Sequence, residues 1–248
     1  MRKVLIIVGG SKGISKSLSK VFNINQFDTY HLSRVKPDFY HTKHLQMDIE
    51  MQDNVNDVLN KLCQEIFLQS YQIASFHFMT GGSLGLYSGN ITNSTKKYSD
   101  IAYHNLIFPL WFTEQISHRL ENRNNIKLHF NYYFSSSQGS LDGHPIYIAC
   151  KSGLQSAFKK LVCQRKENIS YSGYVLGMVD IEHKYLHKLS KNNPLAFDEI
   201  LNSKIPSLNF ANPDDISNFI FKCSQHNTLA NGMLVDISGG GSWIQAKQ

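Results

Sequence analysis

Apolar and polar positions follow two different periods along the chain. Short apolar runs bounded by turn residues predict buried strands, which are Val4–Val8, Asp28–Ser33, His44–Met47, Ile73–Met79, Ile126–Phe134, Tyr171–Leu176 and Met233–Asp236. Apolar residues at helical spacing predict helices over Gly13–Phe22, Asn54–Phe67, about Ser94–Leu120, Ile146–Arg165 and Asp214–Ser224. Strands that alternate with helices are typical of βαβ units. We therefore expect an α/β fold, a doubly wound, mainly parallel seven-stranded sheet with helices on both faces.

One segment departs from both periods. Between about Glu182 and Phe210 the chain is rich in Asn, Lys and Pro, and its periodicity is weak. A long irregular connection in a compact domain is usually a lid or a substrate loop. We expect a single domain over residues 1–248, with a substrate loop at about 180–210.

The composition is that of an ordinary soluble globular protein, with 42% hydrophobic and 18% charged residues. The apolar run Val4–Val8 is too short for a signal peptide or a membrane span, so no membrane partner is expected. The four cysteines show no C-x-x-C spacing. They predict reduced thiols in a cytoplasmic protein.

Charge and histidine spacing narrow the range of partners. The net charge of +6 favours anionic partners, but Lys and Arg occur in runs no longer than a pair. We therefore expect no nucleic-acid partner, with RNA binding kept as a minor alternative. The pairs His41/His44 and His183/His187 lack a further ligand at zinc spacing, so no metal site is expected.

The first predicted strand runs directly into a glycine-rich turn that opens the first helix. Such a turn directs backbone N–H groups and the positive end of the helix dipole toward a pyrophosphate. A plain tight turn is the alternative, but the position at the first strand–helix junction favours dinucleotide binding. The residues expected to contact the cofactor here are Gly9, Ser11, Lys12, Gly13 and Ile14.

The end of the second predicted strand indicates which dinucleotide is bound. Chains that bind NAD place an acidic residue about 20 positions after the turn, where it holds the ribose 2′-hydroxyl. Here that position is Ser33, and Arg34 follows it. Arg34 can hold a 2′-phosphate through two hydrogen bonds, and Lys12 can add a second charge. A solvated loop cation is the alternative for Arg34, but the missing carboxylate favours NADP(H) as the cofactor.

Tyr147 and Lys151 lie four residues apart on a predicted helix and therefore share one face. A cation about 4 Å from a phenol contributes up to about 4 kcal/mol, enough to lower the pKa of a tyrosine by about two or three units. Tyr147 can then donate a proton to a carbonyl oxygen. An exposed pair is the alternative, but the preceding strand ends in Ser135-Ser136-Ser137, and a serine hydroxyl can polarise that carbonyl.

In this order, the glycine turn, the serines, Tyr147 and Lys151 resemble the classical short-chain dehydrogenase/reductase family. The pattern is nearest to the family's 3-oxoacyl-acyl-carrier-protein reductase-like members. The resemblance implies a Rossmann-type fold, a homotetramer or dimer, and the catalytic residues Asn105, Ser136, Tyr147 and Lys151. Ser135 and Ser137 are alternatives to Ser136. An exposed helical asparagine is the alternative for Asn105.

The resemblance also implies further cofactor contacts, from Ser33, Asp48, Gly81, Gly177 and Val179 in addition to Tyr147 and Lys151. For Asp48, an N-cap of the following helix is an equal alternative. Several positions depart from the family pattern, namely Val8 for threonine, Ser15 for the third glycine, Phe78 for asparagine, Leu176 for proline and Ile181 for threonine. These departures imply weaker cofactor binding and leave the acid–base residues intact.

Two functions of different classes follow from these patterns. The first is an NADPH-dependent reductase of a ketone, an aldehyde or a 3-oxoacyl group, with a small-molecule or acyl-carrier substrate. Lysines around the substrate loop, Lys184, Lys188, Lys191 and Lys204, would suit an acidic substrate or carrier. The alternative is an NADP-binding sensor or scaffold of the same fold with little turnover.

Overall fold

A computed structural model describes residues 1–38, 41–81, 95–120, 125–135, 144–164, 166–179, 185–204, 207–225 and 231–240. Its strands form one seven-stranded sheet in the order β3-β2-β1-β4-β5-β6-β7. They are β1 (Lys3–Val8), β2 (Phe27–Ser33), β3 (Thr42–Gln46), β4 (Ile73–Phe78), β5 (Lys127–Ser135), β6 (Ile169–Leu176) and β7 (Met233–Ile237). Every neighbouring pair is parallel. The predicted fold is confirmed, and all the predicted strands are present within a few residues of their expected ends.

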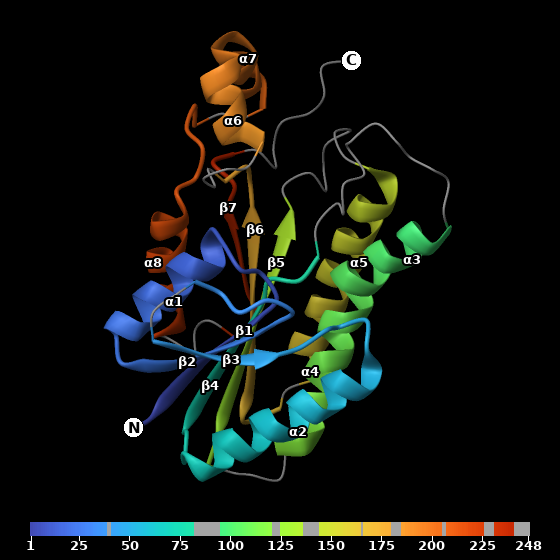
Figure 1. Cartoon of the computed structure of the whole chain (residues 1–248), viewed down its shortest axis with the longest axis vertical. Helices are drawn as coiled ribbons and strands as arrows, with labels where there is room; N and C mark the ends of the chain where they lie inside the picture. Colours follow the sequence, from blue (N-terminus) through green and yellow to red (C-terminus); the bar gives the residue numbers. More distant parts are fainter. Residues whose placement is uncertain are drawn as a thin grey trace.

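Helices cover both faces of the sheet (Figure 1). On one face lie α1 (Ile14–Ile24) and α8 (Pro213–Ser224), and on the other lie α2 (Gln52–Leu68), α4 (Phe108–Leu120) and α5 (Pro145–Val162). Successive side chains of a strand point to opposite faces, so a strand covered on both sides is apolar throughout. In β1, Val4, Ile6 and Val8 face α2 and α4, whereas Leu5 and Ile7 face α1 and α8.

The predicted long helix contains a π-helical turn that the sequence did not indicate. Here α3 (Thr95–Ala102) continues through Tyr103–Ile107, the π turn, into α4. The side-chain amide of Asn105 donates to the Ile101 carbonyl at 3.0 Å. That carbonyl, four residues back, would accept the Asn105 backbone N–H in a regular α-helix. The adjacent residues His104 and Asn105 of this turn are both buried.

The segment predicted to be irregular is largely helical, so that prediction was wrong. It contains α6 (Tyr185–Asn192) and α7 (Pro194–Lys204), which lie beyond the carboxyl ends of β6 and β7 (Figure 1). The Asn193 side chain accepts from the Ala196 N–H at 3.2 Å, and Pro194 begins the helix. An asparagine cap followed by proline indicates the start of a helix, and both residues were present in the sequence. The helix was nevertheless missed because its apolar periodicity is weak: side chains such as Leu195, 83% exposed, do not pack inward.

Two further features bear on the expectations from composition. The four cysteines are free thiols. Across the part of the chain that the structure describes, no helix combines the length and the apolar character that crossing a membrane requires.

The face of the sheet beneath α1 and α8 carries a buried layer of polar side chains. His77 on β4 bonds through Nδ1 to the Tyr133 hydroxyl at 2.6 Å and through Nε2 to the Ser75 hydroxyl at 3.0 Å. Asn131 donates to the Ser75 hydroxyl at 3.2 Å. His129 lies in the same layer and is 1% exposed. Burial lowers the pKa of His129 to about 4 and the pKa of His77 well below its ordinary value, so both histidines are neutral in the folded chain.

These histidines predict a loss of stability in mild acid. The unfolded chain binds a proton at each histidine near pH 6.5, whereas the folded His129 does not until about pH 4. The free energy of unfolding therefore falls as the pH drops from 6.5 toward 4, by about 2 kcal/mol for His129 between pH 7 and pH 5. We expect urea unfolding at the two pH values to show a smaller difference for His129→Asn than for the wild type. His118→Asn, at an exposed position, is the matched control; equal differences in all three proteins would refute the assignment.

Candidate functional site

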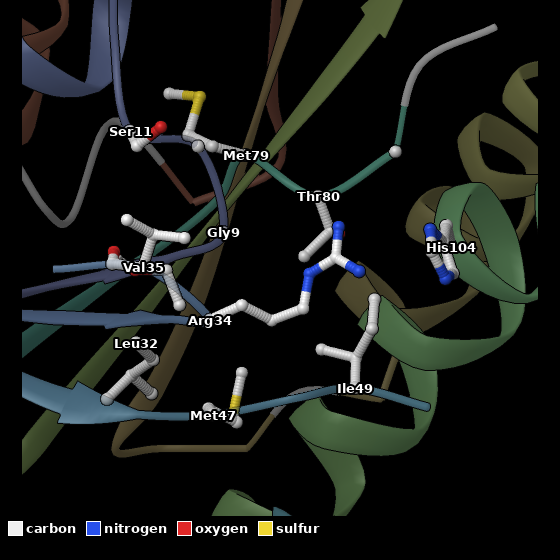
Figure 2. Close-up of a pocket in the computed structure, with 13 residues that line it drawn as sticks. Gly9, Ser11, Leu32, Arg34, Val35, Met47, Ile49, Met79, Thr80 and His104 are labelled. Carbon is white, nitrogen blue, oxygen red and sulfur yellow. Dashed lines mark hydrogen bonds between the residues drawn. The ribbon is translucent and has the colours of Figure 1, made fainter. Parts of the chain in front are cut away.

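A cavity of about 300 Å³ opens where the strand order reverses, between β1 and β4. Its lining comes from the carboxyl ends of β1 to β4 and from the π turn (Figure 2). The lining residues are Gly9, Gly10, Ser11, Leu32, Ser33, Arg34, Val35, Met47, Ile49, Met79, Thr80, Gly81 and His104. In open parallel sheets this crevice is where ligands bind, because the connections diverge to opposite faces there. Of the residues predicted to bind a cofactor, Gly9, Ser11, Ser33, Arg34 and Gly81 line it.

The glycine turn approaches the end of β4 so closely that no side chain fits. A Cβ at Gly9 would lie 2.8 Å from Thr80 Cγ2, and the Gly9 φ of 77° also favours glycine. The Gly9 N–H donates to the Leu32 carbonyl at 2.8 Å, which ties the turn to β2. These contacts hold the backbone of the turn against the floor of the cavity.

Gly10 explains how the chain accommodates Ser15 in place of a glycine. A Cβ at Gly10 would overlap the Ser15 hydroxyl oxygen, and Ser15 itself is 2% exposed. The hydroxyl therefore occupies the space that the missing Gly10 side chain leaves. The turn and α1 are therefore in close contact, and it is the missing side chain of Gly10, not a glycine at position 15, that permits this contact.

The first turn of α1 provides an uncapped helix N-terminus beside the cavity. Gly13 precedes Ile14 with φ 59°; no side chain among the described residues caps the helix, and its first turn contains no acidic residue. The unpaired N–H groups and the positive end of the helix dipole suit an anion. A diphosphate fits this chemistry. Lys12, exposed in the same turn, does not line the cavity.

Arg34 extends from the end of β2 into the cavity, between Ile49 and Thr80 (Figure 2). Among the described residues that line the cavity, none is acidic. The Ser33 hydroxyl donates to the Val35 carbonyl at 2.7 Å and so fixes the loop that carries Arg34. Arg34 is thus an exposed cation that lines the cavity, and a phosphate could bind it without repulsion from the described lining residues. Its contact with a 2′-phosphate stays a prediction.

Asp48 forms a local turn after β3. Its side chain accepts from the Glu50 N–H at 3.2 Å, and its own N–H donates to Asn54 Oδ1 at 2.7 Å. Asp48 does not line the cavity, whereas its neighbours Met47 and Ile49 do. The alternative, in which Asp48 is the N-cap of the following helix, is wrong, because the N-cap residue of α2 is Met51. Contact between Asp48 and a cofactor stays a prediction.

Lys151 is buried in α5, at 8% exposure. Its Nζ donates to the Tyr133 carbonyl at 3.1 Å and lies 5.9 Å from the ring centroid of Tyr147. Burial lowers the pKa of Lys151 to about 8. The two residues share one face of the helix as predicted. The alternative, an exposed pair, is wrong because Lys151 is buried.

Asn105 connects the π turn to the cavity. It is fully buried, and a Cβ at Gly81 would overlap its side-chain oxygen, so Gly81 brings the end of β4 onto the turn. Packing of α5 on the same turn is also close, since a Cβ at Gly153 would lie 3.4 Å from Leu106 Cδ2. The alternative as an exposed helical asparagine is therefore wrong.

The remaining predicted residues lie at the end of β6 or outside the described residues. A Cβ at Gly177 would lie 2.5 Å from the Ser238 carbonyl oxygen, and Val179 pairs with Ala211. Neither lines the cavity. Ser135 ends β5, while Ser136, Ser137 and Ile181 lie outside the described residues. The roles of these residues stay predictions.

Phe78, one of the departures from the family pattern, lies in the aromatic core. Its ring stacks on Tyr132 with centroids 5.1 Å apart and meets Phe112 edge-on at 5.8 Å. It belongs to the apolar core beneath α4, 4% exposed. Aromatic packing therefore braces the sheet here.

Sequence reasoning missed several residues of the cavity, above all His104, Thr80 and Met79. Thr80 and Met79 follow β4, and their part in the cavity depends on pairing between β1 and β4, which is not local in sequence. His104 depends on the π turn. Among the described residues no group of three metal-ligating side chains is close enough to hold a metal ion.

Solved structures with the same fold are similar to the whole chain. No family model and no curated protein matches it. A 4-hydroxyisoleucine dehydrogenase complexed with NADH matches with a TM-score of 0.78 and 19% identity, over 98% of this chain and 100% of that one. An actinorhodin polyketide ketoreductase variant with NADPH gives 0.79 and 13%, over 97% of each chain. A short-chain dehydrogenase from Leptospira borgpetersenii with bound NAD⁺ gives 0.77 and 16%, over 98% and 93%. The chain shares their fold.

The contact between Gly10 and Ser15 predicts an energetic coupling. Gly10→Ala adds a side chain at φ 64°, which costs about 1–2 kcal/mol, and it also overlaps the Ser15 hydroxyl. Ser15→Gly removes the overlap but not the backbone strain. In a double-mutant cycle by urea unfolding, we expect the two substitutions to be coupled by about 1 kcal/mol. Additive effects would show that Ser15 does not occupy the space above Gly10.

Proposed function

We propose that the chain is an NADP(H)-dependent oxidoreductase that reduces a ketone, an aldehyde or a 3-oxoacyl group. The observation that carries the proposal is the buried Lys151, anchored on the Tyr133 carbonyl beside Tyr147. Taking an ammonium group out of water costs several kcal/mol, and a purely structural lysine is rarely placed so. The solved structures of the same fold include a dehydrogenase with NADH and a ketoreductase with NADPH.

The cofactor would bind along the carboxyl ends of the strands. The N-terminus of α1 would hold its diphosphate, Arg34 and Lys12 its 2′-phosphate, and Lys151 its nicotinamide ribose. When bound, the nicotinamide supplies the hydride for reduction. Neighbours of the same fold carry NADH, NAD⁺ or NADPH, so the fold alone does not select among them. Arg34 in a cavity without an acidic lining residue supports NADP(H).

Tyr147 is the proposed proton donor to the substrate oxygen. Its hydroxyl becomes a phenolate as the proton leaves, and the charge on Lys151 stabilises that phenolate in a partly buried site. With its pKa at about 8, Lys151 is mostly charged at pH 7 and loses its charge as the pH rises through that value. Reduction is therefore expected to slow above about pH 8.

Tyr147→Phe tests the proposal. With NADPH and a panel of ketones, aldehydes and 3-oxoacyl thioesters, we expect the variant to lose reduction by about 10²- to 10⁴-fold, because it lacks the proton donor. NADPH binding should change little. The matched control is Tyr30→Phe on β2, which removes a hydroxyl that donates to the Glu65 carboxylate at 2.7 Å. This variant should stay active. NADPH consumption on addition of each carbonyl is the measurement.

Two outcomes would contradict the proposal. Wild-type protein that binds NADPH but reduces no carbonyl of the panel would favour the sensor or scaffold instead. Undiminished turnover by Tyr147→Phe would remove Tyr147 as the proton donor.

A further inference from the structure

His104 faces the cavity from the π turn, across from the strand ends of β1 and β2 (Figure 2). The residue is 8% exposed, and its Nε2 has no hydrogen-bond partner among the described residues. The Thr80 hydroxyl, which also lines the cavity, is buried and unpartnered within the same described part of the chain. An unmet buried polar atom costs about 1–3 kcal/mol. Two such atoms on the lining of one cavity indicate a polar ligand.

Glu50 gives His104 a charged neighbour. One carboxylate oxygen, Oε1, lies 3.5 Å from His104 Nε2, an ion-pair distance at which no hydrogen bond is formed. An imidazole nitrogen that carries a proton can only donate, and a carboxylate oxygen can only accept. The pair therefore presents an acceptor, the carboxylate, and beside it a donor, the imidazole N–H, which is not committed to that acceptor.

The rest of the cavity suits a planar heterocycle. Leu32, Met47 and Ile49 supply apolar surface, and Arg34 supplies a planar cation that can lie against an aromatic face. The volume of about 300 Å³ is at the lower end for a small-molecule site. Asp48, predicted to contact the cofactor, does not line the cavity, and its Oδ1 accepts from the Glu50 N–H. The polar edge of an adenine ring would meet His104, which lines the cavity, and the Glu50 carboxylate, which is not a lining residue but lies 3.5 Å from His104 Nε2.

We propose that His104 and Glu50 select the adenine base of the cofactor. The inference rests on the proposed binding of NADP(H) in this cavity. Adenine presents an amino donor next to a ring-nitrogen acceptor, which complements the carboxylate and the imidazole N–H. Hypoxanthine presents an oxygen acceptor next to an N–H donor, the reverse order. The pair thus accepts adenine and disfavours hypoxanthine. This selection of the base does not depend on the 2′-phosphate, which distinguishes NADPH from NADH.

The test compares NADPH with its hypoxanthine analogue, deamino-NADPH, by isothermal titration calorimetry. We expect wild-type protein to bind NADPH about tenfold more tightly, the effect of one or two hydrogen bonds. His104→Val and Glu50→Gln should each reduce that ratio to about twofold or less. Their preference for NADPH over NADH should stay as in the wild type, which separates loss of base recognition from general damage. His118→Val, at an exposed position on α4, is the matched control and should keep both ratios.

Each other outcome overturns a defined part of the argument. An unchanged adenine preference in both variants, with NADPH still bound, removes His104 and Glu50 as the selecting residues and leaves the proposed function standing. Equal affinity of the wild-type protein for NADPH and deamino-NADPH would also remove His104 and Glu50 as the selecting residues and leave the proposed function standing. No binding of either dinucleotide by wild-type protein overturns the proposed function itself. Glu50 is half-exposed, so its variant keeps the test decisive if His104→Val fails to fold.

Discussion

The close approach of the glycine turn to the end of β4 is the contact on which the rest of the site depends. Gly9 lies against Thr80, and this is feasible only because β1 and β4 pair side by side although β2 and β3 come between them in sequence. The strand order reverses at that pair, so the chains leaving β1 and β4 diverge and leave a cavity. A side chain at Gly9 would push the turn away from Thr80. The N-terminus of α1, which follows the turn, would move with it.

The π turn joins this cavity to the proposed acid–base residues. Through Asn105 it contacts Gly81 at the end of β4, and through Leu106 it contacts Gly153 on α5, the helix that carries Tyr147 and Lys151. In this turn His104 lines the cavity, and the next residue, Asn105, is fully buried. One local departure from α-helical geometry therefore positions groups for two purposes. π turns often occur at functional sites for this reason.

Features with a local cause were predictable from the sequence, and those with a distant cause were not. The strands follow from continuous apolar runs, and Arg34 follows from a fixed spacing after the glycine turn. The π turn has no local signal, so His104 was missed. The turn at Asp48 depends on Asn54, six residues on, and α7 begins at the Asn193 cap while most of its residues are not buried. The accommodation of Ser15 by Gly10 needed the packed structure to be seen.

The central claim is that the cavity between β1 and β4 binds the adenosine end of NADP(H), with Arg34 on the 2′-phosphate. Its most direct test is the affinity of NADPH and NADH for wild-type protein, Arg34→Ala and the control Lys36→Ala, an exposed cation two residues on. The account predicts a wild-type preference for NADPH of about tenfold or more, lost in Arg34→Ala and kept in Lys36→Ala. Equal affinity for the two dinucleotides, or a preference that survives Arg34→Ala, would contradict it.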